Sequence, residues 1–422
     1  MSKFITLNKE DKLSAQLKVV GVGGGGCNAI ESMMERGLQG VEYVAVNTDA
    51  QVLQMSRADH KIQIGTNVTR GLGAGADPNI GRKALEEDRD KISKVLEGSD
   101  MVFVTAGMGG GTGTGGAPLV ASIAKSLGAL VIGIVTKPFK WEGKRRMLNA
   151  EEGIHDLRRN VDSLIIIPND RLLNILDKTV SARTAFDKPN EVLYEATRGI
   201  ADIITIPGII NVDFADVRSV MNSSGEALMG AGIANGENRA IEAAQKAISS
   251  PLLDGISIKG AKNILLNVTG SDDLTMLEID EGNKVIYDAA GEEANVIFGW
   301  VSKEEMNDNV SYTVIATGFG DTDKPASKIV PEKKEETPEE KQEKYMGYSV
   351  ENFEIPSEQE ELEKPTIFRV KGANKMFLEN QDVPNGGFKF DQLDAFEPAE
   401  VGKDEKKKHK KGGSSFLRMM MD

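Results

Sequence analysis

Short aliphatic runs alternate with amphipathic stretches along the first half of the chain, beginning at Leu17. The runs are almost continuously apolar and rich in β-branched residues, as expected for parallel strands that are covered on both faces. Such alternation predicts βαβ units and therefore a doubly wound parallel sheet. The predicted strands are 17–23, 41–48, 100–107, 129–136 and 162–169, and the predicted helices are 29–37, 81–98 and 117–128, with Gly37, Gly98 and Gly128 placed where helices end.

The second half has a different pattern. A long helix is predicted over 190–206, with a break at Pro207–Gly208, and a shorter helix over 236–250. Three strands then follow close together, with turn residues between them, which is typical of a smaller α/β domain with a mixed sheet. These predicted strands are 261–270, 295–302 and 311–320.

The composition changes after residue 320. Residues 321–370 hold fourteen acidic and eight basic residues and few apolar ones, so this segment is predicted to be disordered. A basic cluster, KDEKKKHKK (403–411), and the apolar peptide FLRMMMD (416–422) come at the end. The predicted organisation is an N-terminal extension (1–14), a nucleotide-binding domain (15–180), a connecting helix region (181–210), a second domain (211–320), a disordered linker (321–402) and a basic cluster with a docking peptide (403–422).

Length and charge narrow the class of protein. The chain has 422 residues, too many for one compact core, and a formal net charge of −14, which disfavours nonspecific nucleic-acid binding. The first residues lack the apolar core of a secretory signal, and no run approaches the ~20 apolar residues of a membrane span. The single cysteine, Cys27, allows no internal disulfide. We therefore expect a cytoplasmic protein with no nucleic-acid partner and no direct membrane span.

Glycine is enriched, with 45 residues in 422, and it is clustered in two loops. GVGGGGCN (21–28) follows the first predicted strand and matches G-x-G-x-x-G in its strand–turn–helix setting. Such a loop lets backbone amides and a helix N-terminus face an anion. By itself the motif also fits a nicotinamide cofactor, because Asp49 in NTDA (47–50) stands where a ribose-binding acid would be.

The second loop favours a polyphosphate over a dinucleotide cofactor. MGGGTGTGGAP (108–118) follows the strand at 100–107 and also leads into a helix. Two glycine loops at the ends of neighbouring strands suit several phosphates held from two sides. Neither loop contains G-K-[ST], so backbone amides, helix dipoles, the hydroxyls of Thr112 and Thr114, and Mg²⁺ are expected to balance the charge. No metal-ligating residues can be assigned from the sequence.

These motifs resemble those of a known family. GGGTGTG (109–115) is the signature of the tubulin/FtsZ superfamily, and the sequence is similar to the bacterial cell-division GTPases of the FtsZ family over residues 15 to 320. The other matching segments are GVGGGGCN, TKPFKWEGKRR (136–146), IPNDRLL (167–173) and NVDFADVR (211–218). The resemblance implies a polymerising cytoskeletal GTPase that converts GTP and water to GDP and phosphate.

The resemblance also implies which residues contact GTP or GDP. The phosphates are held by the two loops, the ribose and phosphates by Glu142 and Arg146, and the base by Phe186 and Asn190. An aromatic face can stack on any base, and an amide can read the guanine edge. The implied contacts in the loops are Gly24, Gly25, Gly26, Cys27, Asn28, Gly111, Thr112 and Gly113.

The glycine loops offer no group that could orient the attacking water, which GTP hydrolysis requires. NVDFADVR carries Asp213 and Asp216, which share one face if a helix begins there, although Asp213 could equally be a helix N-cap. In the family this segment completes the site of a neighbouring subunit. Asn211 would support the loop, and Asp213 and Asp216 would polarise the water and coordinate the metal region. A contact of this head-to-tail kind propagates into a filament.

The resemblance further implies a division ring beneath the cytoplasmic membrane at the future septum. The terminal peptide 414–422 would bind a membrane-tethering adaptor and division regulators, although Ser414–Ser415 stand where relatives often have Ile-Pro. A plain solubilising tail is the alternative for this segment. For the whole protein, the alternatives are a nicotinamide-dependent oxidoreductase, a nucleotide-retaining scaffold without turnover, and a plasmid-partitioning relative of tubulin.

Overall fold

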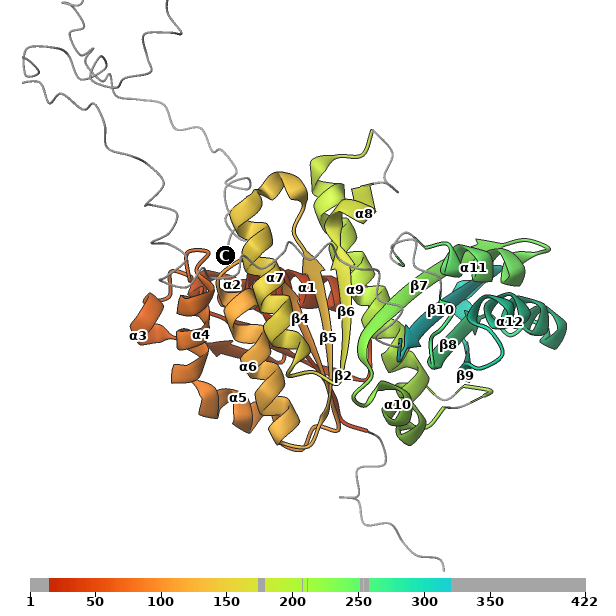
Figure 1. Cartoon of the computed structure of the whole chain (residues 1–422), viewed down its shortest axis with the longest axis horizontal. Coiled ribbons are helices and arrows are strands. Elements are labelled where there is room, and N and C mark those ends of the chain that lie inside the picture. Colours follow the sequence, from red (N-terminus) through yellow and green to blue (C-terminus); the bar gives the residue numbers. More distant parts are fainter. Residues whose placement is uncertain are drawn as a thin grey trace, which may run out of the picture. The chain divides into compact units, whose positions relative to one another are not determined.

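The computed structural model describes residues 15–173, 179–206, 208–210, 212–250, 253 and 258–319. Within them, ten strands form one sheet in the order β3-β2-β1-β4-β5-β6-β7-β10-β8-β9 (Figure 1). The predicted extension, linker and docking peptide lie outside the described residues. The strands are β1 (Leu17–Val22), β2 (Val41–Asn47), β3 (His60–Gln63), β4 (Met101–Gly107), β5 (Leu130–Lys137), β6 (Ser163–Pro168), β7 (Gly225–Asn235), β8 (Asn263–Gly270), β9 (Asn295–Ser302) and β10 (Asn309–Thr317).

Strand direction divides the sheet into two parts. β1 to β6 pair only in parallel, whereas β10 runs antiparallel to β7 and β8. The predicted fold class, a doubly wound parallel sheet followed by a smaller part with a mixed sheet, is therefore confirmed. The helices are α1 (Gly23–Glu35), α2 (Ala50–Met55), α3 (Thr66–Thr69), α4 (Pro78–Glu87), α5 (Arg89–Leu96), α6 (Thr112–Ser126), α7 (Lys144–Arg158), α8 (Asn169–Leu173), α9 (Ala182–Thr205), α10 (Phe214–Met221), α11 (Arg239–Ile248) and α12 (Met276–Ala290).

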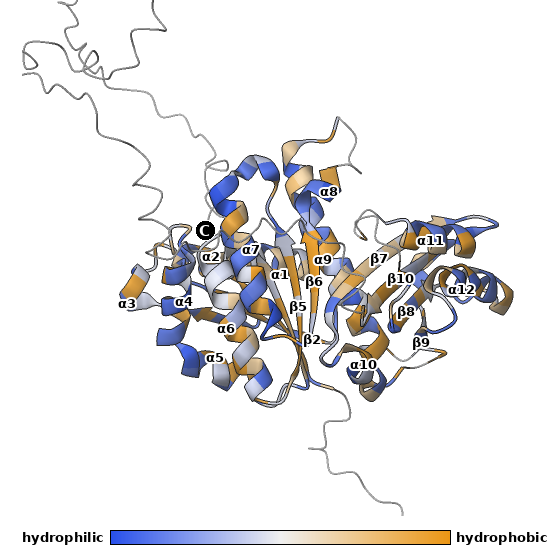
Figure 2. Cartoon of the chain, viewed as in Figure 1, coloured by the Kyte–Doolittle hydropathy of each residue, from blue (hydrophilic) through white to orange (hydrophobic). Residues whose placement is uncertain are grey.

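Both faces of the parallel part are buried, which explains its apolar strands. Val19 on β1 joins a core cluster with residues of α1 and α9, while its neighbour Val20 joins a cluster with residues of α4, α5, α6 and α7. Successive side chains point to opposite faces of a strand, so a strand covered on both sides must be apolar throughout. The strands are accordingly hydrophobic along their length in Figure 2, with polar residues on the helices around them.

The strand order locates the place where a ligand is expected to bind. Across the parallel part, the order β3-β2-β1-β4-β5-β6 reverses direction between β1 and β4. In open α/β sheets, ligands bind beyond the carboxyl ends of the strands at such a reversal. β1 and β4 are the two strands that lead into the glycine loops.

Several element boundaries differ from those predicted. α1 and α6 begin at Gly23 and Thr112, inside the predicted loops, so the glycines form the first helical turns as well as the loops. The single helix predicted over 81–98 is two helices that meet at Asp88, whose carboxylate accepts a hydrogen bond from the backbone N–H of Gly65 at 2.8 Å. α9 begins at Ala182 with Ser181 as its N-cap, rather than at residue 190. Gly37, Gly98 and Gly128 have positive φ and follow α1, α5 and α6, as predicted.

The structure also contains elements that the pattern did not predict, namely β3, β7, α2, α3, α7, α8 and α12. β7 has only one β-branched residue, Ile233, and α11 packs directly on its glycines. A Cβ on Gly230 would lie 2.1 Å from the backbone oxygen of Ala247, and one on Gly232 would lie 2.2 Å from that of Ala243. α12 did have a local signal, since Thr275 and Glu278 form a capping box at its start.

Candidate nucleotide-binding site

The two glycine loops lie against each other at the carboxyl ends of β1 and β4. Gly23 has a φ of +73°, and a Cβ added to it would lie 2.7 Å from the backbone nitrogen of Gly113. A Cβ on Gly25 would lie 3.0 Å from the backbone of Gly107. Real Cβ atoms essentially never approach closer than 3.0 Å, so glycine is required at Gly23, and a side chain at Gly25 would force its neighbour to shift. The two anion cradles predicted from the sequence therefore form one surface.

Two helix N-termini open onto this surface. α1 follows Val22 and α6 follows Gly111, and neither helix has a side-chain cap or an acidic residue in its first turn. The first N–H groups of a helix have no partner within it, and the helix dipole favours negative charge there. The predicted contacts Gly24, Gly25 and Gly26 lie in the first turn of α1, and Thr112 and Gly113 in that of α6. The geometry is suited to binding phosphate groups.

Gly26 and Gly111 also have a packing role. A Cβ on Gly26 would lie 2.5 Å from the backbone oxygen of Thr105, so this glycine lets α1 approach β4. A Cβ on Gly111 would lie 2.7 Å from the Cβ of Ala74 and 3.0 Å from the backbone nitrogen of Asp77. Each of these positions therefore needs glycine even without a ligand.

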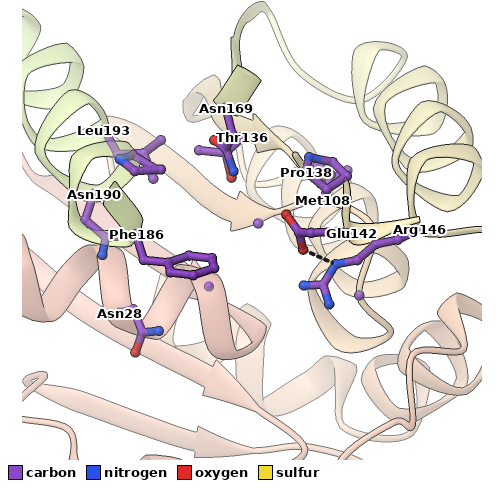
Figure 3. Close-up of a pocket in the computed structure, with 14 residues that line it drawn as sticks. Asn28, Met108, Thr136, Pro138, Glu142, Arg146, Asn169, Phe186, Asn190 and Leu193 are labelled. Carbon is purple, nitrogen blue, oxygen red and sulfur yellow. Dashed lines mark ion pairs between the residues drawn. The ribbon is translucent and has the colours of Figure 1, made fainter. Parts of the chain in front are cut away.

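A pocket adjoins the loops and brings together six of the predicted contacts (Figure 3). It encloses about 660 Å³, part of it open to solvent. Phe186 and Asn190 reach it from α9, and Glu142 and Arg146 from the opposite side. The lining residues are Gly25, Asn28, Gly107, Met108, Gly110, Thr136, Pro138, Glu142, Arg146, Asn169, Phe186, Pro189, Asn190 and Leu193.

The aromatic side of the pocket is held by a ring cluster. Phe186 makes edge-to-face contacts with Phe139 and Trp141, at centroid distances of 5.7 and 5.8 Å. Trp141 is 64% exposed and stacks on Phe139. The cluster orients Phe186 at the pocket wall, where a planar base could stack on it.

Asn169 is a lining residue that the sequence pattern did not single out. It is buried, with 8% of its surface exposed, and its Oδ1 has no hydrogen-bond partner among the described residues. A buried polar atom without a hydrogen-bond partner destabilises the fold. A ligand that donates a hydrogen bond to Asn169 Oδ1 would therefore bind more tightly. The segment IPNDRLL carries part of the family resemblance, but only the fold shows that this asparagine lines the same pocket as Phe186 and Asn190.

Glu142 and Arg146 form an ion pair at the pocket wall. Arg146 Nε lies 3.0 Å from Glu142 Oε2, one helical turn away, and the other carboxylate oxygen accepts the backbone N–H of Phe139 at 2.7 Å. The pair therefore fixes the segment that leads into α7. It places a cationic side chain close to the second glycine loop, since a Cβ on Gly109 would lie 2.7 Å from Arg146 Cγ.

Three other side chains of the loops are bonded within the protein. The hydroxyls of Thr112 and Thr48 share a hydrogen bond of 2.7 Å, and Thr114 Oγ1 accepts the backbone N–H of Gly109 at 2.8 Å. Cys27 is buried in the core, with Sγ 4.0 Å from the backbone oxygen of Gly21. These bonds hold the second loop and α6 in shape, and the predicted contact of the two threonine hydroxyls with phosphates stays a prediction.

Asp213 and Asp216 lie near the amino ends of the parallel strands, at the edge of the sheet opposite the pocket. Arg218 of the same helix, α10, donates to the backbone oxygen of Gly128, which precedes β5, whereas Thr136 at the end of β5 lines the pocket. α9 connects the two edges, and its 24 residues correspond to about 36 Å. Asp213 is the N-cap of α10, accepting the N–H of Asp216 at 2.8 Å, and both residues are exposed. Within one chain these carboxylates do not reach the pocket. Asn211 lies outside the described residues.

Comparison with known proteins agrees with this geometry. Residues 16–177 match the Tubulin/FtsZ family, GTPase domain, and residues 225–320 match the FtsZ family, C-terminal domain. The chain is 44% identical to an FtsZ from M. jannaschii solved as an empty dimer, with a TM-score of 0.70, covering 73% of this chain and 89% of that one. The chain belongs to the FtsZ family. As a member of the Tubulin/FtsZ GTPases, it binds GTP and GDP and hydrolyses GTP.

Other solved structures extend the likeness beyond FtsZ. A point mutant of M. jannaschii FtsZ is 44% identical, with a TM-score of 0.69, over 72% of this chain and 92% of that one. CetZ2 from Haloferax volcanii, in a GTPγS-bound protofilament, is 22% identical with a TM-score of 0.62, over 71% of this chain and 92% of that one. At that identity the likeness shows the fold alone. The bacterial origin implied by the sequence stays a prediction.

The FtsZ-family fold also explains why Asp49 is not a ribose-binding acid. Its carboxylate accepts the backbone N–H groups of Gln51 and Val52 at 2.8 and 3.4 Å, which makes it the N-cap of α2. It is not among the residues that line the pocket. The oxidoreductase alternative therefore loses the acidic residue on which it depended.

Two further findings concern the described part of this FtsZ-family chain. It holds no group of three or more His, Cys, Asp or Glu side chains that could bind a metal ion by themselves. None of its helices is long and apolar enough to cross a membrane. Trp300 is buried, whereas Trp141 is 64% exposed.

Cys27 is expected to be chemically inert in the folded protein. Burial raises the pKa of its thiol from 9.0 to about 12, so almost no thiolate is present at pH 8. Incubation with a thiol-specific disulfide reagent at pH 8 should leave the native protein unlabelled and label it quickly in urea. Rapid labelling before any loss of helical signal would show that the thiol is accessible and reactive.

Proposed function

We propose that this protein assembles head to tail into protofilaments and hydrolyses GTP at the contact between subunits. The observation that supports this most directly is the separation of the pocket from Asp213 and Asp216, at opposite edges of one sheet. A subunit stacked in the same orientation on another would present its acidic edge to the neighbour's pocket. Such a contact is heterologous and does not close on itself, so it extends into a filament.

In the proposed site, each group has one task. The N-termini of α1 and α6 bind the phosphates, with Gly24, Gly25, Gly26, Cys27 and Asn28 in the first loop and Gly111, Thr112 and Gly113 in the second. Since the Cys27 side chain is buried, its contact would come from the backbone. Glu142 and Arg146 contact the ribose and phosphates. Phe186 stacks on the guanine, whose polar edge faces Asn190 and Asn169.

Asp213 and Asp216 of the neighbouring subunit would orient and polarise the water that attacks the γ-phosphate, with Asn211 supporting their loop. Mg²⁺ fits this site if the phosphates supply most of its ligands. The described residues offer no carboxylate cluster, and Mg²⁺ in phosphate sites usually keeps several waters and takes one or two carboxylates. Its role would be to neutralise phosphate charge.

The dependence of GTP turnover on protein concentration tests whether the catalytic site forms only on assembly. Turnover per molecule should rise steeply with protein concentration, in step with light scattering, and GDP should not support scattering. The measurement is phosphate release and scattering in the same samples, with sedimentation to identify the monomer range. Full turnover per molecule in samples that contain only monomers would contradict the proposal.

We further propose that the filaments form the division ring beneath the cytoplasmic membrane and recruit other division proteins. The support is membership of the FtsZ family, together with the terminal segment 403–422 predicted to dock on a membrane adaptor. A fluorescent fusion should form a ring at mid-cell before septation. Deleting 403–422 should abolish the ring and leave GTPase activity intact. A filament that never coincides with a septum would instead indicate another cytoskeletal role.

Phe186→Ala should weaken GTP binding by about tenfold, because base stacking on an aromatic ring contributes roughly 1–3 kcal/mol. Displacement of a fluorescent GDP analogue measures the affinity. Phe186→Tyr retains the ring and serves as the matched control, with near-normal affinity expected. Equal affinity of the alanine and wild-type proteins would place the base elsewhere.

A further inference from the structure

The segment NTDA (47–50) contains Asn47 and Thr48, the two residues before Asp49, and their contacts are more informative than those of Asp49. It begins at the last residue of β2 and leads into α2. Asn47 and Thr48 are both fully buried, with 0% exposure, although both are polar. Neither is among the residues that line the pocket. Buried polar groups are normally retained because they hold specific partners.

Thr48 bonds to the first residue of α6. Its hydroxyl lies 2.7 Å from that of Thr112, which is also fully buried. β1 lies between β2 and β4 in the sheet, so this bond connects the end of β2 to the start of α6 across the turn between β1 and α1. The two residues are 64 positions apart in the sequence.

Asn47 makes the corresponding contact to the other helix. Its amide Nδ2 lies 3.9 Å from Cys27 Sγ on α1, and its Oδ1 accepts the backbone N–H of Asp49 at 3.2 Å. Consecutive residues of one segment thus contact both helices whose N-termini face the proposed phosphate site. The spacing between those helices is tight, because a Cβ on Gly23 would lie 3.4 Å from Thr112 Cβ and 2.7 Å from the nitrogen of Gly113.

We propose that Thr48, supported by Asn47, is a positioning residue that sets the relative placement of the two phosphate-binding helix N-termini. Thr112 would then contribute its backbone N–H to the phosphates while its hydroxyl is held by Thr48. Without the Thr48 hydroxyl, that of Thr112 is left buried and unpaired, and the start of α6 shifts to find another partner. This inference rests on the assignment of the pocket and loops as the GTP site.

The test separates phosphate binding from base binding. GTP and guanosine are competed against a fluorescent GDP analogue on wild-type, Thr48→Val and Thr48→Ser proteins. Thr48→Val should lower GTP affinity by about tenfold, the equivalent of one buried hydrogen bond, and leave guanosine affinity unchanged. Thr48→Ser keeps the hydroxyl and should restore GTP affinity. The turnover number measured at saturating GTP should also fall in the valine variant, because the γ-phosphate is misplaced.

Controls distinguish positioning from general loss of stability. Thr317 is also fully buried and donates its hydroxyl to Val220 at the opposite edge of the sheet, so Thr317→Val should lower the thermal midpoint without changing GTP affinity. If Thr48→Val does not fold, the double variant Thr48→Val/Thr112→Val leaves no unpaired hydroxyl and should fold. It still lacks the bond that holds the start of α6 to the end of β2, so it should also lose GTP affinity selectively.

Unchanged GTP affinity in Thr48→Val, or an equal loss for GTP and guanosine, would overturn the inference. Wild-type protein that binds guanosine as tightly as GTP would instead disprove the site assignment itself.

Discussion

Asp216→Asn is expected to reduce GTP turnover by about 100-fold or more while GTP affinity stays at the wild-type value, since positioned acid–base groups contribute at least this much. The carboxylate is exposed in the first turn of α10, far from the pocket of its own chain, so its loss cannot disturb nucleotide binding directly. Phosphate release at a concentration that gives full assembly measures the effect.

Asp213 needs a substitution that keeps its capping role. Its Oδ1 accepts the N–H of Asp216, and alanine would cost about 1 kcal/mol of stability by removing the cap. Asn and Ser cap helices about as well as Asp, so Asp213→Asn tests the charge alone. The matched control for Asp216→Asn is Asp90→Asn, because Asp90 is also an exposed acid in the first turn of a helix, α5. Loss of turnover in the control as well would remove the special role of α10.

Mixing two inactive variants gives the sharper form of this test. Gly25→Val should block the pocket but keep the acidic edge, and Asp216→Asn keeps the pocket but not the acid. A mixture contains interfaces with an intact pocket facing an intact acid, so part of the turnover should return. No recovery, despite co-assembly in sedimentation, would mean that each subunit uses its own residues.

Gly23→Ala is expected to abolish GTP binding and to destabilise the fold. Its φ of +73° disfavours any side chain, and its Cβ would lie 2.7 Å from the backbone of Gly113, so the two loops would have to separate. Gly37→Ala separates these two causes. Gly37 has a similar φ of +77° but nothing within 4 Å of the added Cβ, so it should lose only about 1–2 kcal/mol and bind GTP normally.

Calorimetric titration with GTP and thermal unfolding of both variants measure this difference. Normal GTP affinity in Gly23→Ala would show that the close contact between the loops is not needed for binding. Loss of affinity in Gly37→Ala would indicate that left-handed backbone strain, rather than loop contact, accounts for the effect.

The local sequence pattern was sufficient to predict much of the secondary structure in the nucleotide-binding half. Runs such as 17–23 and 100–107 are apolar on nearly every residue because both faces of their strands are buried, and that requirement is visible in a single sequence. The glycine loops could be recognised for a similar reason. A backbone that must approach another backbone within 3 Å excludes side chains, and this leaves a run of glycines in the sequence.

Elements with weaker local requirements were missed. β7 is built largely of alanine, glycine and methionine because α11 packs on it, so the cause of its composition lies in a helix that follows it in the chain. Secondary-structure propensity reflects only neighbours within a few residues, so it does not reveal that α11 packs on β7. Asn169 was passed over for the same reason, since its unpaired oxygen is apparent only when α8 and α9 are in place.

The amino-acid sequence alone established the repeated strand–helix order, the two glycine cradles and the pair of aspartates at 213 and 216. Its short-range pattern carries these features because each depends on backbone geometry or burial within a few residues. The order of strands in the sheet depends instead on contacts between distant segments. Only the folded chain showed the full order of the strands, the bond between Thr48 and Thr112, and the position of the aspartates at the edge opposite the pocket.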